Sequence, residues 1–263
     1  MHRAVLLAGL LLASPVLAQD APSKIIIAGD STAANYPASR FPQTGWGMFL
    51  GCALTPGVAV DNQAIGGRST KSFIDEGRLD RLLAGLKPGD TVLIQFAHND
   101  ANRQKPERFV EARGAYRDNL LRFIWQIRGA GGVPVLVTPV ARRSFADGHA
   151  KADFAEYSAV VRELAATTAA PLIDLETLSR GLLDRTGFEA SKHYYLHYTP
   201  KDGIAAFPEG IIDDTHFSEI GARRMADLVA GGLARLSLPI SAKMRIKRPE
   251  LTRRKPLGSA ACR

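Results

Sequence analysis

The chain has 263 residues, of which 46% are hydrophobic and 23% are charged, and it carries a formal net charge of +8. This length fits one medium-sized domain that can bury a core without disulfide or metal staples. The charge is unevenly placed, because residues 243–263 carry +7, Arg3 carries +1, and residues 19–242 are neutral overall. A nucleic-acid-binding domain needs a basic face of its own, so a neutral body argues against a nucleic-acid partner.

Residues 1–18 have the order of a cleavable secretory signal peptide. Two polar residues at positions 2 and 3 precede an apolar block without a polar face, and Pro15-Val16-Leu17-Ala18 follows before Gln19. No run after residue 18 approaches the ~20 apolar residues that cross a bilayer. The sequence therefore predicts an exported protein, secreted or periplasmic, with no integral membrane segment.

Five short apolar runs follow along the chain. Each is nearly continuous in apolar residues, which is typical of strands buried on both faces of a sheet. They are residues 24–28, 57–60, 91–96, 133–139 and 171–174.

Amphipathic helices separate or follow these runs. Their apolar residues recur with helical spacing over residues 116–127, 154–164 and 225–236, and Ser218 is a candidate cap for the last helix. Alternating strands and helices predict a single-domain α/β fold, a three-layer α/β/α sandwich of flavodoxin-like type around a five-stranded parallel sheet. We place this domain at residues 19–242.

Polar segments stand where three of the apolar runs end. Ser31 follows the first run within Gly-Asp-Ser-Thr, Gly67 lies beyond the second, and Asn99 follows the third within His-Asn-Asp. A fourth segment, residues 213–216 (Asp-Asp-Thr-His), precedes the last helix. Parallel sheets bind ligands at the carboxyl ends of their strands, so we expect these segments to converge.

Together these segments contain the groups that acyl transfer by a serine needs. Ser31 is the candidate nucleophile, His216 the base that takes its proton, and Asp213 the carboxylate that orients the imidazole. The candidate oxyanion donors are the backbone N–H groups of Ser31 and Gly67 and the side-chain amide of Asn99. The sequence leaves open whether Gly67 or its neighbour Gly66 donates.

These four segments, together with Gly45-Trp46-Gly47, resemble the SGNH (GDSL-like) hydrolases, and most closely the rhamnogalacturonan acetylesterase branch. The resemblance runs from about Lys24 to Leu236. It implies the SGNH hydrolase fold and the same catalytic and oxyanion-hole roles. One departure is Ala97, where the family often has glycine.

The resemblance implies an exported serine esterase that removes O-acetyl groups from a plant cell-wall polysaccharide, with rhamnogalacturonan in pectin as the preferred polymer. The reaction is expected to pass through an acyl-enzyme on Ser31 and to need no cofactor. One alternative is an SGNH lipase or thioesterase acting on other acyl esters, which the polar segment 188–212 disfavours. Another is a non-catalytic polysaccharide-binding protein, which has no need of Ser31, Asp213 and His216 together. The oligomeric state is not determined by the sequence.

Further residues are weaker candidates for substrate binding. Arg68 can contact an acidic sugar or brace neighbouring loops, and His98 stands beside Asn99. The long stretch 188–212, whose length is typical of a functional loop, offers His193, Tyr194 and His197 for stacking on a sugar or for packing the loop itself. The two histidines lack a third ligand at a recognisable spacing, so we assign no metal.

The two cysteines and the basic C-terminal segment have no predicted catalytic role. An exported location permits Cys52 and Cys262 to pair, but the sequence does not decide whether they do. We expect residues 243–263 to form a flexible, solvated tail. A second reading is that this tail holds the protein near an anionic polysaccharide.

Overall fold

The computed structural model describes residues 24–262. The predicted signal peptide, residues 1–18, lies outside the described residues. Within residues 24–262, no helix has the length and apolar character to cross a membrane.

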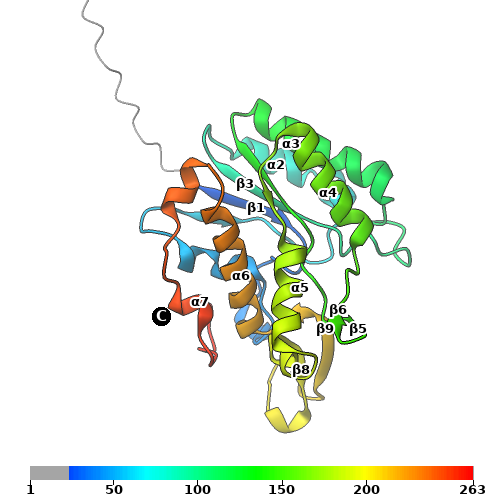
Figure 1. Cartoon of the computed structure of the whole chain (residues 1–263), viewed down its shortest axis with the longest axis vertical. Coiled ribbons are helices and arrows are strands. Elements are labelled where there is room, and N and C mark those ends of the chain that lie inside the picture. The colour runs from blue at the N-terminus through cyan, green and yellow to red at the C-terminus, as the bar shows by residue number, and fades with distance from the viewer. Residues whose placement is uncertain (1–23, 263) are drawn as a thin grey trace, which may run out of the picture.

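The centre of the molecule is a sheet of five parallel strands, as predicted (Figure 1). The strand order β2-β1-β3-β4-β7 places the first strand inside the sheet. The strands are β1 (Ile25–Gly29), β2 (Val60–Asn62), β3 (Thr91–Gln95), β4 (Val133–Val137) and β7 (Leu172–Ile173). Each overlaps or adjoins one of the five apolar runs.

Side-chain alternation along β1 explains why its run is continuously apolar. Ile25 and Ile27 enter one hydrophobic cluster, whereas Ile26 and Ala28 enter another on the opposite face. All four side chains are fully buried. A strand covered on both faces needs apolar residues at every position.

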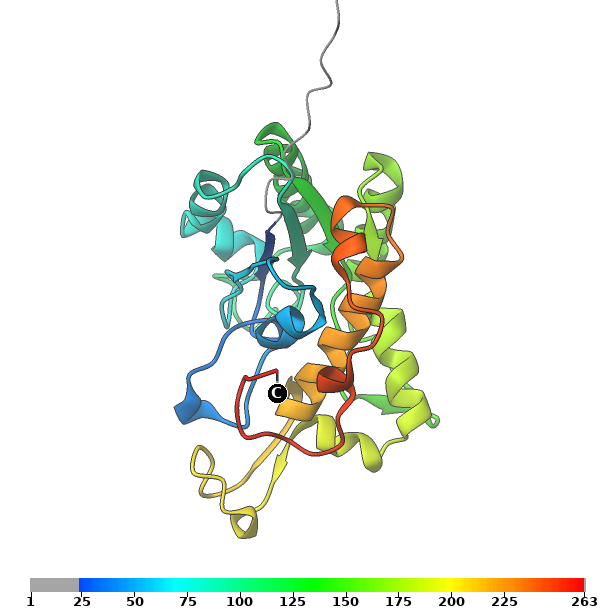
Figure 2. The ribbon, with the colours of Figure 1, turned by 90° about the vertical axis from the view of Figure 1, so that its left-hand side faces the viewer.

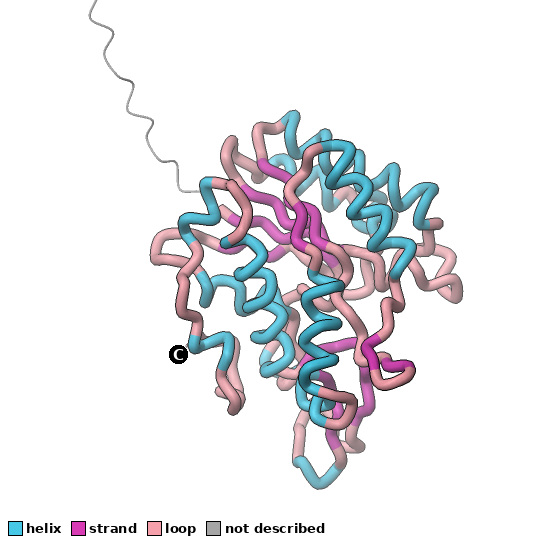
Figure 3. Tube along the Cα trace, viewed as in Figure 1, coloured by secondary structure: helices cyan, strands magenta, loops and turns pink. Residues whose placement is uncertain are grey.

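Helices cover both faces of the sheet and complete three layers (Figures 1 and 3). One cluster joins the sheet to the 3-10 helix η2 (Trp46–Ala53), α5 (Leu175–Thr186) and α6 (Glu219–Ala234). The other cluster joins it to α1 (Thr70–Asp75), α2 (Arg78–Ala84), α3 (Arg117–Gly129) and α4 (Ala155–Thr168). The predicted cap of the last helix is confirmed, since the Ser218 side chain accepts a hydrogen bond from Gly221 N.

Two antiparallel hairpins lie outside the sheet. The smaller pairs β5 (Phe145–Ala146) with β6 (His149–Ala150), and the larger pairs β8 (Tyr195–Tyr198) with β9 (Ile211–Phe217). The larger hairpin projects at one end of the molecule in both views (Figures 1 and 2). Part of the stretch predicted as irregular, 188–212, is therefore ordered as strand, because its backbone pairs with the segment that carries Asp213 and His216.

The C-terminal segment packs against α6, which differs from the flexible tail expected from composition (Figure 2). Its short helix α7 (Pro249–Thr252) buries Leu251 completely. Cys262 forms a disulfide with Cys52 of η2, with 5.3 Å between the Cα atoms. The pairing that the sequence left open is therefore present.

A buried ion pair explains why this basic segment is held. Arg223 and Glu219 of α6 lie 2.8 Å apart with no solvent exposure of the arginine. The Glu219 carboxylate accepts hydrogen bonds from the backbone N–H groups of Leu257 and Gly258, and Arg223 donates to the carbonyl of Ala261. A buried ion pair is costly unless its remaining donors and acceptors are satisfied, and the C-terminal backbone satisfies them here.

Candidate active site

Ser31, His216 and Asp213 form a continuous hydrogen-bonded series. The Nε2 atom of His216 lies 3.0 Å from Ser31 Oγ, and its Nδ1 atom lies 2.7 Å from Asp213 Oδ2. Ser31 follows β1, whereas the other two residues lie on β9. The fold thus joins groups that are 185 residues apart in the chain.

The backbone around Ser31 is fixed by side chains on both sides. Asp30 is fully buried, and its Oδ1 accepts hydrogen bonds from Thr32 N and Thr32 Oγ1. Gly45 lies so close to this turn that a Cβ there would come within 2.2 Å of the Ala34 carbonyl oxygen. Gly45, the first residue of Gly45-Trp46-Gly47, is therefore required because two backbone segments approach each other closely there.

Asp213 is held in the ionised form. Burial raises the pKa of this carboxyl group, but hydrogen bonds from the ring and the backbone N–H of His216, with a further one from Thr215 N, outweigh burial and lower the pKa to about 2. A carboxylate bonded to Nδ1 fixes the tautomer in which Nε2 faces Ser31 as a proton acceptor.

Three candidate oxyanion donors surround Ser31. Within residues 24–262, neither the backbone N–H of Ser31 nor that of Gly67 donates a hydrogen bond to another protein group. The Asn99 amide donates one N–H to the carbonyl of Arg68, 2.9 Å away, which leaves its second N–H for a ligand. Gly66 also lines the space beside Ser31, so both glycines remain candidates.

Arg108 is a site residue that the sequence did not reveal. Its Nη1 atom donates to Gly67 O and to Asn99 Oδ1, each 3.0 Å away. It therefore links two of the candidate oxyanion groups and fixes which side of the Asn99 amide is the donor. Arg108 stands in a loop without periodic pattern, so no sequence signal distinguishes it.

A buried polar cluster lies behind Ser31. His98 Nδ1 lies 3.4 Å from Asp30 Oδ2, and Asp100 accepts hydrogen bonds from Thr70 N and Thr70 Oγ1. Burial alone would raise the pKa of Asp30, but interactions with His98 and Thr32 lower it. Burial, assisted by the charge of Asp30, raises the pKa of Asp100 to about 7. Between about pH 4 and pH 7, Asp100 therefore keeps its proton while Asp30 is ionised.

The backbone of Ala97 explains why glycine suits that position. Its φ is +143°, a region that favours glycine, and its side chain is fully buried. The departure at Ala97 therefore keeps the strained turn that presents His98 and Asn99.

These residues line a hollow of about 500 Å³ that is rich in polar side chains. Its lining consists of Ser31, Tyr36, Arg40, Gln43, Gly66, Gly67, His98, Asn99, Asn102, Arg108, Arg142, Asp213, Thr215 and His216. Every predicted catalytic and oxyanion residue is in this set, together with His98.

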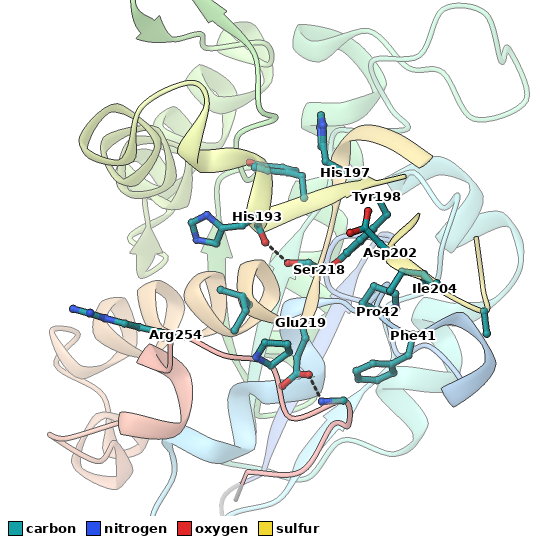
Figure 4. A pocket seen from close by; sticks show the side chains of 16 residues that line it. Phe41, Pro42, His193, His197, Tyr198, Asp202, Ile204, Ser218, Glu219 and Arg254 are labelled. Atoms are coloured by element: carbon teal, nitrogen blue, oxygen red, sulfur yellow. Dashed lines mark hydrogen bonds between the residues drawn. The ribbon is translucent and has the colours of Figure 1, made fainter. Parts of the chain in front are cut away.

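The other predicted binding residues lie elsewhere. His193 and His197 line a second hollow between the larger hairpin, the Phe41-Pro42 segment and the C-terminal segment (Figure 4). Tyr194 is 6% exposed and packs in the core, consistent with a role in holding the loop on the body. Arg68 Nε lies 3.1 Å from Glu76 Oε1, and its Nη1 donates to Gly66 O, so it braces the glycine turn.

His197 also takes part in a charged cluster. Its Nε2 lies 2.7 Å from Asp214 Oδ1, and Arg143 Nη1 lies 3.0 Å from the same oxygen. Within the described part of the chain, no group of three or more histidine, cysteine or acidic side chains is arranged to hold a metal ion.

The fold and this hollow correspond to a known class of hydrolases. The profile of the GDSL-like lipase/acylhydrolase family matches residues 27–224. The chain therefore belongs to the GDSL-like lipase/acylhydrolase family, and the SGNH resemblance of its sequence segments is confirmed.

Two curated relatives are rhamnogalacturonan acetylesterases by name, both from Bacillus subtilis (strain 168). The chain is 40% identical to the probable rhamnogalacturonan acetylesterase YesY over 82% of its own length and 95% of that protein. It is 39% identical to the rhamnogalacturonan acetylesterase RhgT over 83% of its own length and 93% of that protein. The predicted likeness to this branch is confirmed.

Solved structures share the fold. The Bacillus subtilis protein YxiM superposes with a TM-score of 0.71 at 28% identity, covering 84% of this chain and 58% of that one. The acetylxylan esterase Axe2 from Geobacillus stearothermophilus superposes with a TM-score of 0.57 at 20% identity, covering 80% of this chain and 93% of that one. At that identity the second likeness concerns the fold alone.

Proposed function

We propose that the protein is an exported serine esterase that removes O-acetyl groups from a plant cell-wall polysaccharide. The observation that carries this proposal is the hydrogen-bonded series Ser31, His216 and Asp213, with spacings of 3.0 and 2.7 Å, beside unused N–H donors. The two relatives of about 40% identity, both rhamnogalacturonan acetylesterases by name, support the acetyl ester as substrate.

The reaction proceeds through an acyl-enzyme on Ser31. His216 Nε2 takes the hydroxyl proton as Ser31 Oγ attacks the acetyl carbonyl carbon, and Asp213 stabilises the resulting imidazolium. The negative charge on the carbonyl oxygen is met by the N–H groups of Ser31 and Gly67 and the free N–H of Asn99. His216 then gives its proton to the departing sugar alkoxide.

The second half repeats these roles with water as the nucleophile. His216 removes a proton from water, the hydroxide adds to the acetyl-serine, and collapse of this intermediate returns the proton to Ser31 and releases acetate. Each N–H donor in the oxyanion site is expected to contribute ~3 kcal/mol to transition-state stabilisation. Every step is completed by side chains and backbone of this chain, without a cofactor.

Among polysaccharides, we propose acetylated rhamnogalacturonan as the substrate. The names of the two Bacillus subtilis relatives support it, and so does the polar lining of the hollow at Ser31, which suits sugar hydroxyls. A lipase or thioesterase needs an apolar channel at the nucleophile. The more apolar hollow, lined by Phe41, Pro42 and Ile204, does not include Ser31.

Acetate release from a panel of substrates tests the proposal. Equal amounts of acetyl ester are supplied as acetylated rhamnogalacturonan, acetylated xylan and a long-chain acyl ester. We expect the highest kcat/KM on acetylated rhamnogalacturonan. Preferred turnover of the long-chain ester would assign the protein to the lipase alternative instead, and absence of turnover on all three would favour a non-catalytic binder.

Export is proposed from residues 1–18, and the Cys52 and Cys262 disulfide supports it, since such bonds persist in oxidising compartments. Expression of the full chain followed by N-terminal sequencing of the exported product provides the test. A mature protein starting near Gln19 is expected. Retention of the uncleaved chain inside the cell would contradict it.

A further inference from the structure

The hollow at Ser31 is positively charged. Arg40, Arg108 and Arg142 line it, whereas Asp213 is the one acidic residue in its lining. Asp213 is already paired with His216, 2.7 Å away. Residues 19–242 carry no net charge as a whole, whereas the lining of this hollow has three arginines and one aspartate. Positive charge is therefore concentrated where the proposed substrate binds.

Arg142 is the most informative of the three arginines. No hydrogen bond or ion pair joins its guanidinium group to another described residue, and its Nε atom is buried without a partner. Its neighbour Arg143 differs, because it bonds to Asp214 and to the carbonyl oxygen of Phe188. A partly buried cation without a counter-ion is unusual in a protein that has acidic residues to offer.

Arg142 is nevertheless held in place. Its guanidinium carbon lies 5.1 Å from the ring centroid of Phe154, and the His98 ring packs on that same phenylalanine at 4.4 Å. Phe154 is only 5% exposed, so it is a rigid support. Stacking on an aromatic ring orients a guanidinium group while leaving its N–H donors for a ligand.

The other arginines of the hollow have different tasks. Arg108 is occupied by Gly67 and Asn99. Arg40 is exposed at the rim, where its Nη2 donates to Gln43, and no acidic residue pairs with it among residues 24–262. Arg68, the residue that the sequence suggested for an acidic sugar, is bonded to Glu76 and is outside the lining of the hollow.

We propose that Arg142, assisted by Arg40 at the rim, forms a carboxylate-binding subsite for a uronic acid residue of the acetylated saccharide. This inference rests on the proposed esterase function, and it adds that the ester is recognised together with a nearby negative charge. A guanidinium group binds a carboxylate through two parallel N–H···O hydrogen bonds, which a neutral sugar cannot replace. The subsite therefore selects acidic polysaccharides over neutral ones such as xylan.

A matched pair of substrates tests the subsite in the wild-type protein. Acetylated rhamnogalacturonan oligosaccharides are compared with the same oligosaccharides after methyl esterification of their carboxyl groups. We expect kcat/KM for acetate release to be about tenfold to hundredfold higher on the free acid, and this preference to weaken at high salt. Equal kcat/KM on both forms would overturn the subsite but leave the esterase function intact.

Two other outcomes would contradict the substrate class or the esterase function itself. If neither form releases acetate while acetylated xylan does, the acidic substrate class is wrong. If no acetylated saccharide is hydrolysed, the proposed function itself fails.

Three variants then assign the preference to Arg142. Arg142→Gln should reduce the ratio of kcat/KM on the free acid to that on the methyl ester by about tenfold, and Arg142→Lys should restore part of it. Arg185→Gln removes the same charge from an exposed position of α5 and serves as the control, with the wild-type ratio expected. An equal loss on both substrates in Arg142→Gln would mean that the arginine only supports the fold.

Discussion

Arg108 donates a 3.0 Å hydrogen bond from Nη1 to Oδ1 of Asn99. This contact makes the amide nitrogen, and not the oxygen, face the oxyanion site. The amide nitrogen also donates to Arg68 O, so both ends of the side chain are fixed. A pre-oriented donor costs no reorganisation when charge develops on the substrate.

Replacing this arginine should therefore impair the chemical step. We expect Arg108→Ala to lower kcat on a small neutral acetyl ester by roughly tenfold to hundredfold with a smaller change in KM, because the donor is misplaced in the transition state. Asn99→Ala should lower kcat by about 10²–10³, and the double variant should be little worse than Asn99→Ala alone. Fully additive losses would show that Arg108 does not act through Asn99.

Asp213 should matter through the orientation of His216. Asp213→Asn leaves the shape unchanged but donates an N–H where a carboxylate accepted one, which favours the wrong imidazole tautomer. We expect kcat to fall by about 10³–10⁴ while circular dichroism and thermal unfolding show a folded protein. A loss below tenfold in steady-state kinetics would remove Asp213 from the catalytic set.

The central strands β1, β3 and β4 were predictable because each buries side chains on both faces, so apolar composition alone marks them. Site residues were predictable where a short segment carries several chemically special residues, as around Ser31 and His216. Arg108 and Arg142 could not be found this way, since they stand in irregular segments and acquire their roles only from neighbours distant in sequence. The order of the strands likewise depends on packing that no local pattern records.

The C-terminal segment shows how composition can mislead. Its basic residues predict a solvated tail, but the contacts that hold it include backbone N–H and carbonyl groups, the buried Leu251 side chain and the disulfide of Cys262. The backbone contacts carry no sequence signal. These backbone groups bond to the buried ion pair of Glu219 and Arg223 on α6. In the sequence this pair has the four-residue spacing of an ordinary surface ion pair, so its burial is not evident.

The disulfide should contribute measurably to stability. We expect Cys262→Ser to lower the free energy of unfolding by roughly 2–4 kcal/mol, because the bond links residues 210 apart and limits the unfolded chain. Urea denaturation with and without reductant measures this, and reductant should affect only the wild-type protein. Identical midpoints for both proteins under oxidising conditions would contradict the stabilising role.

Asp100 should make stability depend on pH. Its pKa of about 7 exceeds its ordinary value of 3.8, so between these values the folded state keeps a proton that the unfolded state has lost. The free energy of unfolding should therefore fall as pH rises from about 4 to 7. Asp100→Asn removes this titration. Its free energy of unfolding should therefore fall by roughly 2–4 kcal/mol less than that of the wild-type protein between about pH 4 and pH 7.

A surface carboxylate supplies the comparison for this measurement. Asp118 on α3 is 74% exposed, so Asp118→Asn should retain the wild-type slope. Urea unfolding at several pH values gives both slopes. If Asp100→Asn and the wild-type protein have the same slope, Asp100 is ionised throughout that range in the folded state.

The most direct test concerns Ser31 itself. Acetate release from acetylated rhamnogalacturonan is measured for the wild-type protein and for Ser31→Ala, with thermal unfolding to establish that both are folded. We expect a fall in kcat of several orders of magnitude, since removing the nucleophile leaves only the oxyanion site and binding. Near-normal release by folded Ser31→Ala would contradict the assignment of Ser31 as the nucleophile.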